Sequence, residues 1–207
     1  MKRLHLDEIE GVPVFGTLVW KPVRKTLGIT AFGINAYKAE NAGDEVVEDH
    51  AESTFRHEEV YVVVSGRATF TVDGEDIDAP AGTLVFLDDP SQRRAARAQE
   101  AGTTVLAIGG RPGAHEISAW EYVFPALPYA HDGDYARAAQ IVRDGIAERG
   151  ELPVLLYHLA CFEARLGERD AALEHLAVAV AGEERLREAA REDEDLASLR
   201  DDPRFPG

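Results

Sequence analysis

The residues of this chain best suited to chemistry lie between positions 50 and 59. His57 and Glu59 are two residues apart, so in a β-strand their side chains face the same way, and His50 and Glu52 precede them closely. Imidazole and carboxylate groups together are typical ligands of Fe, Mn, Ni or Zn. A second interpretation is a polar surface loop that also contains three neighbouring acids: Glu48, Asp49 and Glu58. We favour the surface loop, because a stable metal site needs three or four well-placed ligands.

Glycines at fixed distances frame this segment. Glu59 is followed after six intervening residues by Gly66, and a second segment has the pattern Gly82-x5-Asp88-x-Pro90-x2-Arg93. This spacing resembles the cupin superfamily, whose first motif is G-x5-H-x-H-x3/4-E-x6-G and whose second motif is G-x5-P-x-G-x2-H. The resemblance implies an all-β cupin-type barrel, that is, a double-stranded β-helix or jelly roll.

In that family the two motifs place three histidines and one carboxylate around a divalent metal. Counted back from Glu59, the paired histidines of the first motif fall on Ser53 and Phe55, and the histidine of the second falls on Arg93. Only Glu59 therefore keeps a ligand side chain, and a guanidinium has no lone pair for a metal. We expect no resident cofactor. The alternative is a divalent metal held by His50, His57 and Glu59.

The same positions predict a ligand pocket inside the barrel. Its expected residues are Glu59, Arg93, Tyr61, Ser53 and Phe55. In one interpretation Arg93 binds the carboxylate or phosphate of a small molecule. In the other, Arg93 and Glu59 pair with each other and replace the metal as a polar plug. Both interpretations predict that Arg93 points into the barrel and lies near Glu59.

The elements that must position these residues change character along the chain. Residues 1–118 contain short runs of Val, Ile, Thr, Phe and Tyr separated by turn residues, a pattern typical of a β-sandwich or barrel. The dipeptide Asp73-Gly74 between two such runs predicts a tight hairpin. We therefore assign 1–118 to the barrel.

Residues 119–207 are rich in Ala, Leu, Glu and Arg at helical spacing. Segments 34 residues apart match, with Gly133 over Gly167 and Ala138 over Ala172, which resembles the tetratricopeptide repeat. The ending is similar to that of many bacterial proteins with such repeats. About two repeats seldom stand alone, so we expect these helices to pack on the barrel or on a second subunit.

Composition limits the partners. The chain of 207 residues has a net charge of -16, from 22 basic and 38 acidic residues, which disfavours nucleic acid and anionic membrane surfaces. The single cysteine, Cys161, and the lack of an apolar leader lead us to expect a cytoplasmic protein. We also expect a homodimer, paired through an exposed strand edge at 12–20.

These observations lead to three functional hypotheses. The first is a small-molecule-binding or scaffolding protein with a degenerate metal site, for which we expect a deep polar pocket. The second is a metal-dependent enzyme of dioxygenase or isomerase type, for which we expect bound metal. The third is an interaction module that binds a protein partner through its helices, for which we expect a filled barrel. Whether the chain is an enzyme stays open at this point, because a fold alone does not fix a function.

Overall fold

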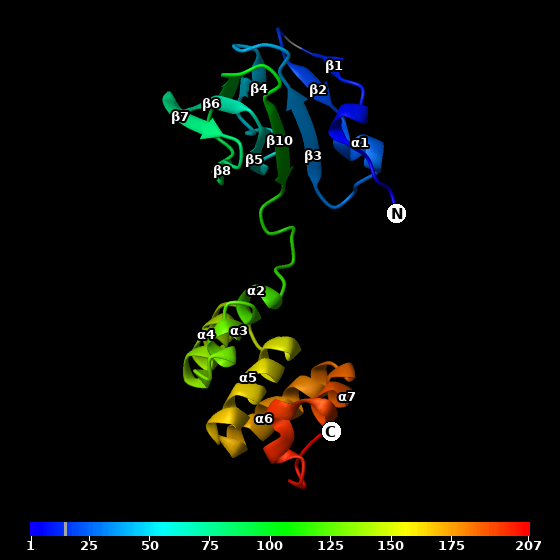
Figure 1. Ribbon diagram of the computed structural model, residues 1–207, viewed down its shortest axis with the longest axis vertical. Coiled ribbons are helices and arrows are strands. Elements are labelled where there is room, and N and C mark those ends of the chain that lie inside the picture. The colour runs from blue at the N-terminus through cyan, green and yellow to red at the C-terminus, as the bar shows by residue number, and fades with distance from the viewer. Residues whose placement is uncertain (15) are drawn as a thin grey trace. The chain divides into compact units, whose positions relative to one another are not determined.

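The computed structural model describes residues 1–14 and 16–207 and divides the chain into two compact units (Figure 1). Met1–His115 forms the β unit, and Glu116–Gly207 forms the helical unit. Of the segment 12–20 that we expect to mediate a dimer, residue 15 lies outside the described residues.

Two antiparallel sheets make up the β unit, as the strand pattern predicts. The six-stranded sheet has the order β1 (Val12–Pro13), β2 (Val19–Lys21), β3 (Gly33–Lys38), β10 (Thr104–Gly110), β5 (Glu58–Ser65), β8 (Leu84–Leu87). The four-stranded sheet has the order β4 (Glu45–His50), β9 (Arg94–Ala98), β6 (Arg67–Val72), β7 (Glu75–Pro80). The unit is not purely β, because it also contains two short helical elements: η1 (Leu6–Glu8) and α1 (Val23–Leu27).

The turn between β6 and β7 follows the sequence prediction. Asp73 and Gly74 both have positive φ, 49° and 89°, and Val72 pairs with Glu75 across the hairpin. A tight two-residue hairpin needs this backbone at both central positions, which Asp-Gly adopts readily. The outcome confirms the predicted hairpin.

The core of the β unit lies between the two sheets. Val63 on β5 and Val105 on β10 meet Val46 of β4 and Phe70 of β6 in one cluster, and all four are fully buried. Because strand side chains alternate between faces, Glu59 and Tyr61 point to the same inner side as Val63. The six-stranded sheet therefore carries polar groups at one end of an otherwise apolar interior.

The helical unit has a buried core of its own. Its elements are α2 (Trp120–Val123), α3 (Leu127–His131), α4 (Tyr135–Arg149), α5 (Pro153–Leu166), α6 (Arg169–Gly182), α7 (Arg185–Glu192) and η2 (Glu194–Leu199). Leu155, Leu159, Leu176 and Leu196 have at most 2% of their surface exposed. The tetratricopeptide-like character of this unit stays a prediction.

Across the described ranges, the helices are all too short or too polar to cross a membrane.

Candidate functional site

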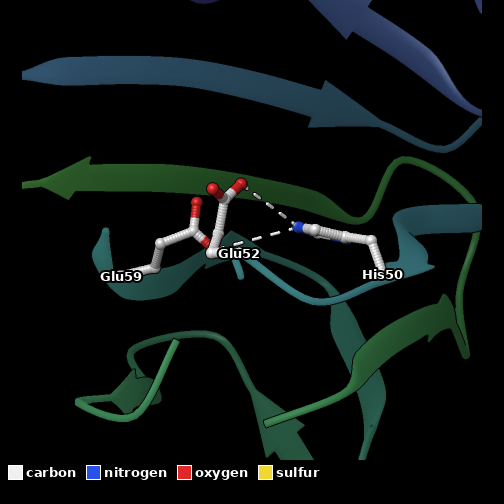
Figure 2. A group of neighbouring side chains, drawn as sticks. All are labelled: His50, Glu52 and Glu59. Atoms are coloured by element: carbon white, nitrogen blue, oxygen red, sulfur yellow. Dashed lines mark ion pairs between the residues drawn. The ribbon is translucent and has the colours of Figure 1, made fainter. Parts of the chain in front are cut away.

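Three side chains with metal-ligating atoms converge inside the β unit (Figure 2). His50 ends β4, Glu59 lies in β5, and Glu52 belongs to the turn that joins these strands. The His50 Nε2 atom lies 3.7 Å from Glu52 Oε1 and 3.9 Å from Glu59 Oε2. One ligand atom from each residue lies within 4.8 Å of the others. The three side chains are mostly buried, with 24%, 17% and 13% of their surfaces exposed in the order His50, Glu52, Glu59.

A backbone contact fixes the tautomer of His50. Its Nδ1 atom lies 2.9 Å from the carbonyl oxygen of Glu48. A carbonyl oxygen only accepts, so we assign the hydrogen to Nδ1. The other nitrogen, Nε2, is then directed at the two carboxylates, with a lone pair when the ring is neutral.

Glu59 is held by two further groups. The Tyr61 hydroxyl donates a hydrogen bond of 2.6 Å to Glu59 Oε2, and an Arg94 guanidinium nitrogen lies 3.1 Å from the same oxygen. Burial raises the pKa of Tyr61, and the charge and hydrogen bond of Glu59 raise it further, so the phenol stays protonated and donating. Gly109 lies opposite Glu59 on β10, where a Cβ atom would come within 3.1 Å of the glutamate Cγ. Glycine therefore leaves room for the carboxylate against the sheet.

Arg94 is the buried cation of the site, and the prediction for Arg93 is wrong. The Arg94 side chain is fully buried, and its Nη1 group donates a hydrogen bond of 2.9 Å to the carbonyl oxygen of Gln92. The Arg93 side chain is 68% exposed and pairs with Asp49 through contacts of 2.6 and 2.9 Å. Successive strand residues face opposite sides of a sheet. The loop before β9 is one residue longer than the spacing predicts, so Arg94 points inward and Arg93 points outward. The predicted arginine–glutamate pair forms one residue later.

The other predicted residues fall in different places. Ser53 and Phe55 are exposed in the turn after β4, with Phe55 67% exposed, so neither contributes to the predicted pocket. His57 is partly buried and stacks on the Phe55 ring, with 5.9 Å between ring centroids. The alternative metal site predicted from the sequence consists of His50, His57 and Glu59. The structure brings His50 and Glu59 together, but with Glu52 in place of His57.

These groups line a cavity of about 300 Å³ in the β unit. Its walls are Arg24, Gly33, Asn35, Tyr37, Val47, Glu48, His50, Glu52, His57, Glu59, Tyr61, Ala107 and Gly109. Within the described ranges 1–14 and 16–207, the Oε2 atoms of Glu48 and Glu52 are buried without a hydrogen-bond partner. The same holds for the Nε and Nη2 atoms of Arg94, but Arg94 is not part of the cavity wall. Burial, followed by the charges of Glu48, Glu59 and Glu52, raises the pKa of Tyr37. The cavity therefore combines a negative field with unused acceptors.

Sequence reasoning missed Arg94, Glu48 and Tyr37 as site residues. One signal was available for Glu52, since His50-x-Glu52 keeps the H-x-H spacing of the first motif. Glu52 is one of the four candidate ligands between positions 50 and 59. Counting back from Glu59 instead points to Ser53 and Phe55, because six residues separate Glu52 from Glu59 where the motif allows three or four. Tyr37 comes from β3, and only the folded arrangement of the strands brings it to the site.

Among the comparisons with known proteins, only the one with solved structures found matches. No family model and no curated protein matches the chain. Solved structures similar to it are cupin-superfamily proteins. KdgF from Halomonas sp. is 18% identical with a TM-score of 0.42, covering 50% of this chain and 86% of that one. A sugar phosphate isomerase of the cupin superfamily, from Silicibacter pomeroyi, is 20% identical with a TM-score of 0.44. The match covers 53% of this chain and 76% of that one. A cupin protein from Bacteroides fragilis is 25% identical with a TM-score of 0.40, covering 53% and 90%.

Proposed function

We propose that this chain is a cupin-type protein that binds a small molecule in the polar cavity of its β unit. The observation that carries the proposal is the cavity itself, about 300 Å³ in volume and lined by converging polar groups. A cavity with a few convergent polar groups is the usual form of a small-molecule site. The interaction-module hypothesis called for a filled barrel, so the cavity favours the small-molecule hypothesis over it.

The unsatisfied oxygens of Glu48 and Glu52 support the same proposal. Buried polar atoms nearly always have a partner, and an orphaned one calls for an explanation such as a ligand, ion or water. Arg94 then has a positioning role: it holds Glu59 from the protein side, while Glu48 and Glu52 stay available to the cavity. The ligand-binding role that we predicted for Arg93 has no support, because that side chain lies outside.

The test combines two measurements on the full-length chain. Mass spectrometry of the freshly purified, denatured protein identifies any small molecule that co-purifies. A thermal-shift screen with cationic, neutral and anionic metabolite-sized compounds then finds stabilising ligands. We expect at least one ligand whose stabilisation is reduced by Tyr37→Phe or Glu52→Gln. The control is Glu58→Gln, because Glu58 lies on the same strand as Glu59 but faces the opposite side. If no compound gives a shift that depends on the cavity residues, the proposal is wrong.

A second candidate, a metal-dependent enzyme, has one specific observation in its favour. The donor atoms of His50, Glu52 and Glu59 lie close enough for small shifts to bring them onto one ion. The ligand count argues against a firmly held metal, because Glu59 Oε2 already accepts from Tyr61 and pairs with Arg94. His50, Glu52 and the Oε1 atom of Glu59 are then left to hold an ion, and the buried positive charge of Arg94 beside Glu59 opposes a second cation there. Stoichiometric Fe, Mn, Ni or Zn that is lost in a His50→Ala variant would establish this candidate instead.

A further inference from the structure

The cavity contains more negative than positive charge. Glu48, Glu52 and Glu59 contribute three carboxylates to its walls. Two guanidinium groups oppose these three carboxylates: Arg94, which lies 3.1 Å from Glu59 Oε2, and Arg24, an exposed residue of the cavity wall. Glu48 and Glu52 then face the cavity with one unpaired, buried oxygen each, as far as the structure describes the chain. A ligand that leaves these oxygens unpaired would add to their desolvation penalty.

The electrostatic field of these carboxylates reaches across the cavity. Glu48, Glu59 and Glu52 all act on Tyr37, where they add to burial in raising the pKa of the phenol. A field that opposes a tyrosinate at this position opposes any anion there and favours a cation. The field at Tyr37 and the two unsatisfied oxygens come from the same group of carboxylates. Together they indicate a ligand with positive charge and hydrogen-bond donors.

We propose that the natural ligand of the cavity is a small organic amine, bound as its ammonium form by Glu48 and Glu52. The inference rests on the small-molecule function proposed above and names the class of that molecule. An ammonium group has up to three N–H donors, which can bond to the Glu48 and Glu52 oxygens that have no donor in the protein. The apolar side chains of Val47 and Ala107, which also line the cavity, can contact the carbon skeleton of the amine.

The amine fits the site better than a bare metal ion does. A firmly bound metal needs three or four free ligand atoms, whereas Glu59 is already engaged by Tyr61 and Arg94. An ammonium group needs hydrogen-bond acceptors only, and Glu48 and Glu52 supply them without disturbing the Glu59–Arg94 pair. The cavity volume of about 300 Å³ also leaves space for an organic molecule.

The experiment uses three probes of equal length that differ in charge: butylammonium, butan-1-ol and butanoate. Each is titrated at pH 7 into the isotopically labelled full-length chain and followed by amide NMR shifts around Tyr37 and Glu52. We expect saturable shifts with butylammonium at lower concentration than with the other two. Glu52→Gln should lower the affinity for butylammonium about tenfold, which is the loss expected when one charge-assisted hydrogen bond is removed. Glu58→Gln should bind it like the parent chain.

Each other outcome identifies which idea fails. Binding of butan-1-ol or butanoate in the cavity at equal or lower concentration would overturn the amine and leave the small-molecule function standing. Shifts from none of the three probes, together with a negative ligand screen, would reject both. Binding of Zn²⁺ or Mn²⁺ that depends on His50, with no response to butylammonium, would replace the amine by a metal.

Discussion

Arg94 and Glu59 should stabilise the β unit as a pair, and a double-mutant cycle measures that coupling. The variants are Arg94→Met, Glu59→Gln and the double change, each in the full-length chain. Arg94 is fully buried and its Nη2 atom lies 3.1 Å from Glu59 Oε2. A guanidinium does not lose its proton, so removing Glu59 leaves a buried charge without the carboxylate that pairs with it. Removing Arg94 leaves Glu59 beside the charges of Glu48 and Glu52.

The geometry sets the magnitude. Two unit charges 3.1 Å apart attract each other by about 5 kcal/mol at an effective dielectric constant of about 20. Desolvation opposes part of this attraction, so we expect each single change to lower the free energy of unfolding by about 3–5 kcal/mol. The double variant should be more stable than the sum of the two effects predicts, by about 2–4 kcal/mol.

The assay is urea unfolding, monitored by the fluorescence of Trp20. All variants carry Trp120→Phe, so that the signal comes from the β unit alone. The matched control is the neighbouring surface pair Arg93 and Asp49, which is more than half exposed on both sides. Its cycle, with Arg93→Met and Asp49→Asn, should give a coupling of about 0–1 kcal/mol. A coupling for Arg94 and Glu59 no larger than that of the control pair would refute the argument.

Three further predictions concern Glu52, the two buried tyrosines and the helical unit. Glu52→Gln should raise the free energy of unfolding of the ligand-free chain by about 1 kcal/mol, because it removes a buried charge beside two others; an unchanged or lower urea midpoint would contradict this. The folded-state pKa of Tyr37 and Tyr61 is raised, so their contribution to stability is complete below about pH 10 and is lost as the pH rises further. Tyr61→Phe should therefore flatten the loss of stability between about pH 10 and 12, and an unaltered slope would count against it. The isolated segment 116–207 should unfold cooperatively, despite the expectation from repeat count, because it has its own buried core; a broad, non-cooperative thermal transition would disprove this.

Much of the β unit could be predicted because its signals are local. The alternation of strand residues places Glu59 and Tyr61 on one face, and the structure joins them by a hydrogen bond. Asp73-Gly74 predicts its hairpin because few other dipeptides adopt two consecutive positive φ angles easily. Both inferences need only near neighbours in the sequence.

The remaining parts of the site depend on loop lengths and on contacts between distant strands. One extra residue before β9 moves the inner position from Arg93 to Arg94, and spacing taken from a motif cannot detect it. The turn at 51–57 likewise defeats the count back from Glu59, which points to Ser53 and Phe55, whereas the structure brings His50 and Glu52 to the site. Tyr37 reaches the cavity from β3, which pairs with β10 and not with β5, so its role follows from sheet order.

The central claim is that the polar cavity serves a small molecule and not a resident metal, because Glu59 is engaged by Tyr61 and Arg94. Metal analysis of the freshly purified full-length chain tests it most directly. With Glu59 engaged by protein groups, we predict less than about one-tenth of an equivalent of transition metal per chain, well below the content of a site with three or four free ligands. Adding Zn²⁺ or Mn²⁺ should leave the thermal transition of the β unit nearly unchanged. Near-stoichiometric Fe, Mn, Ni or Zn that disappears in a His50→Ala variant would contradict the claim and make the metal-dependent enzyme the better account.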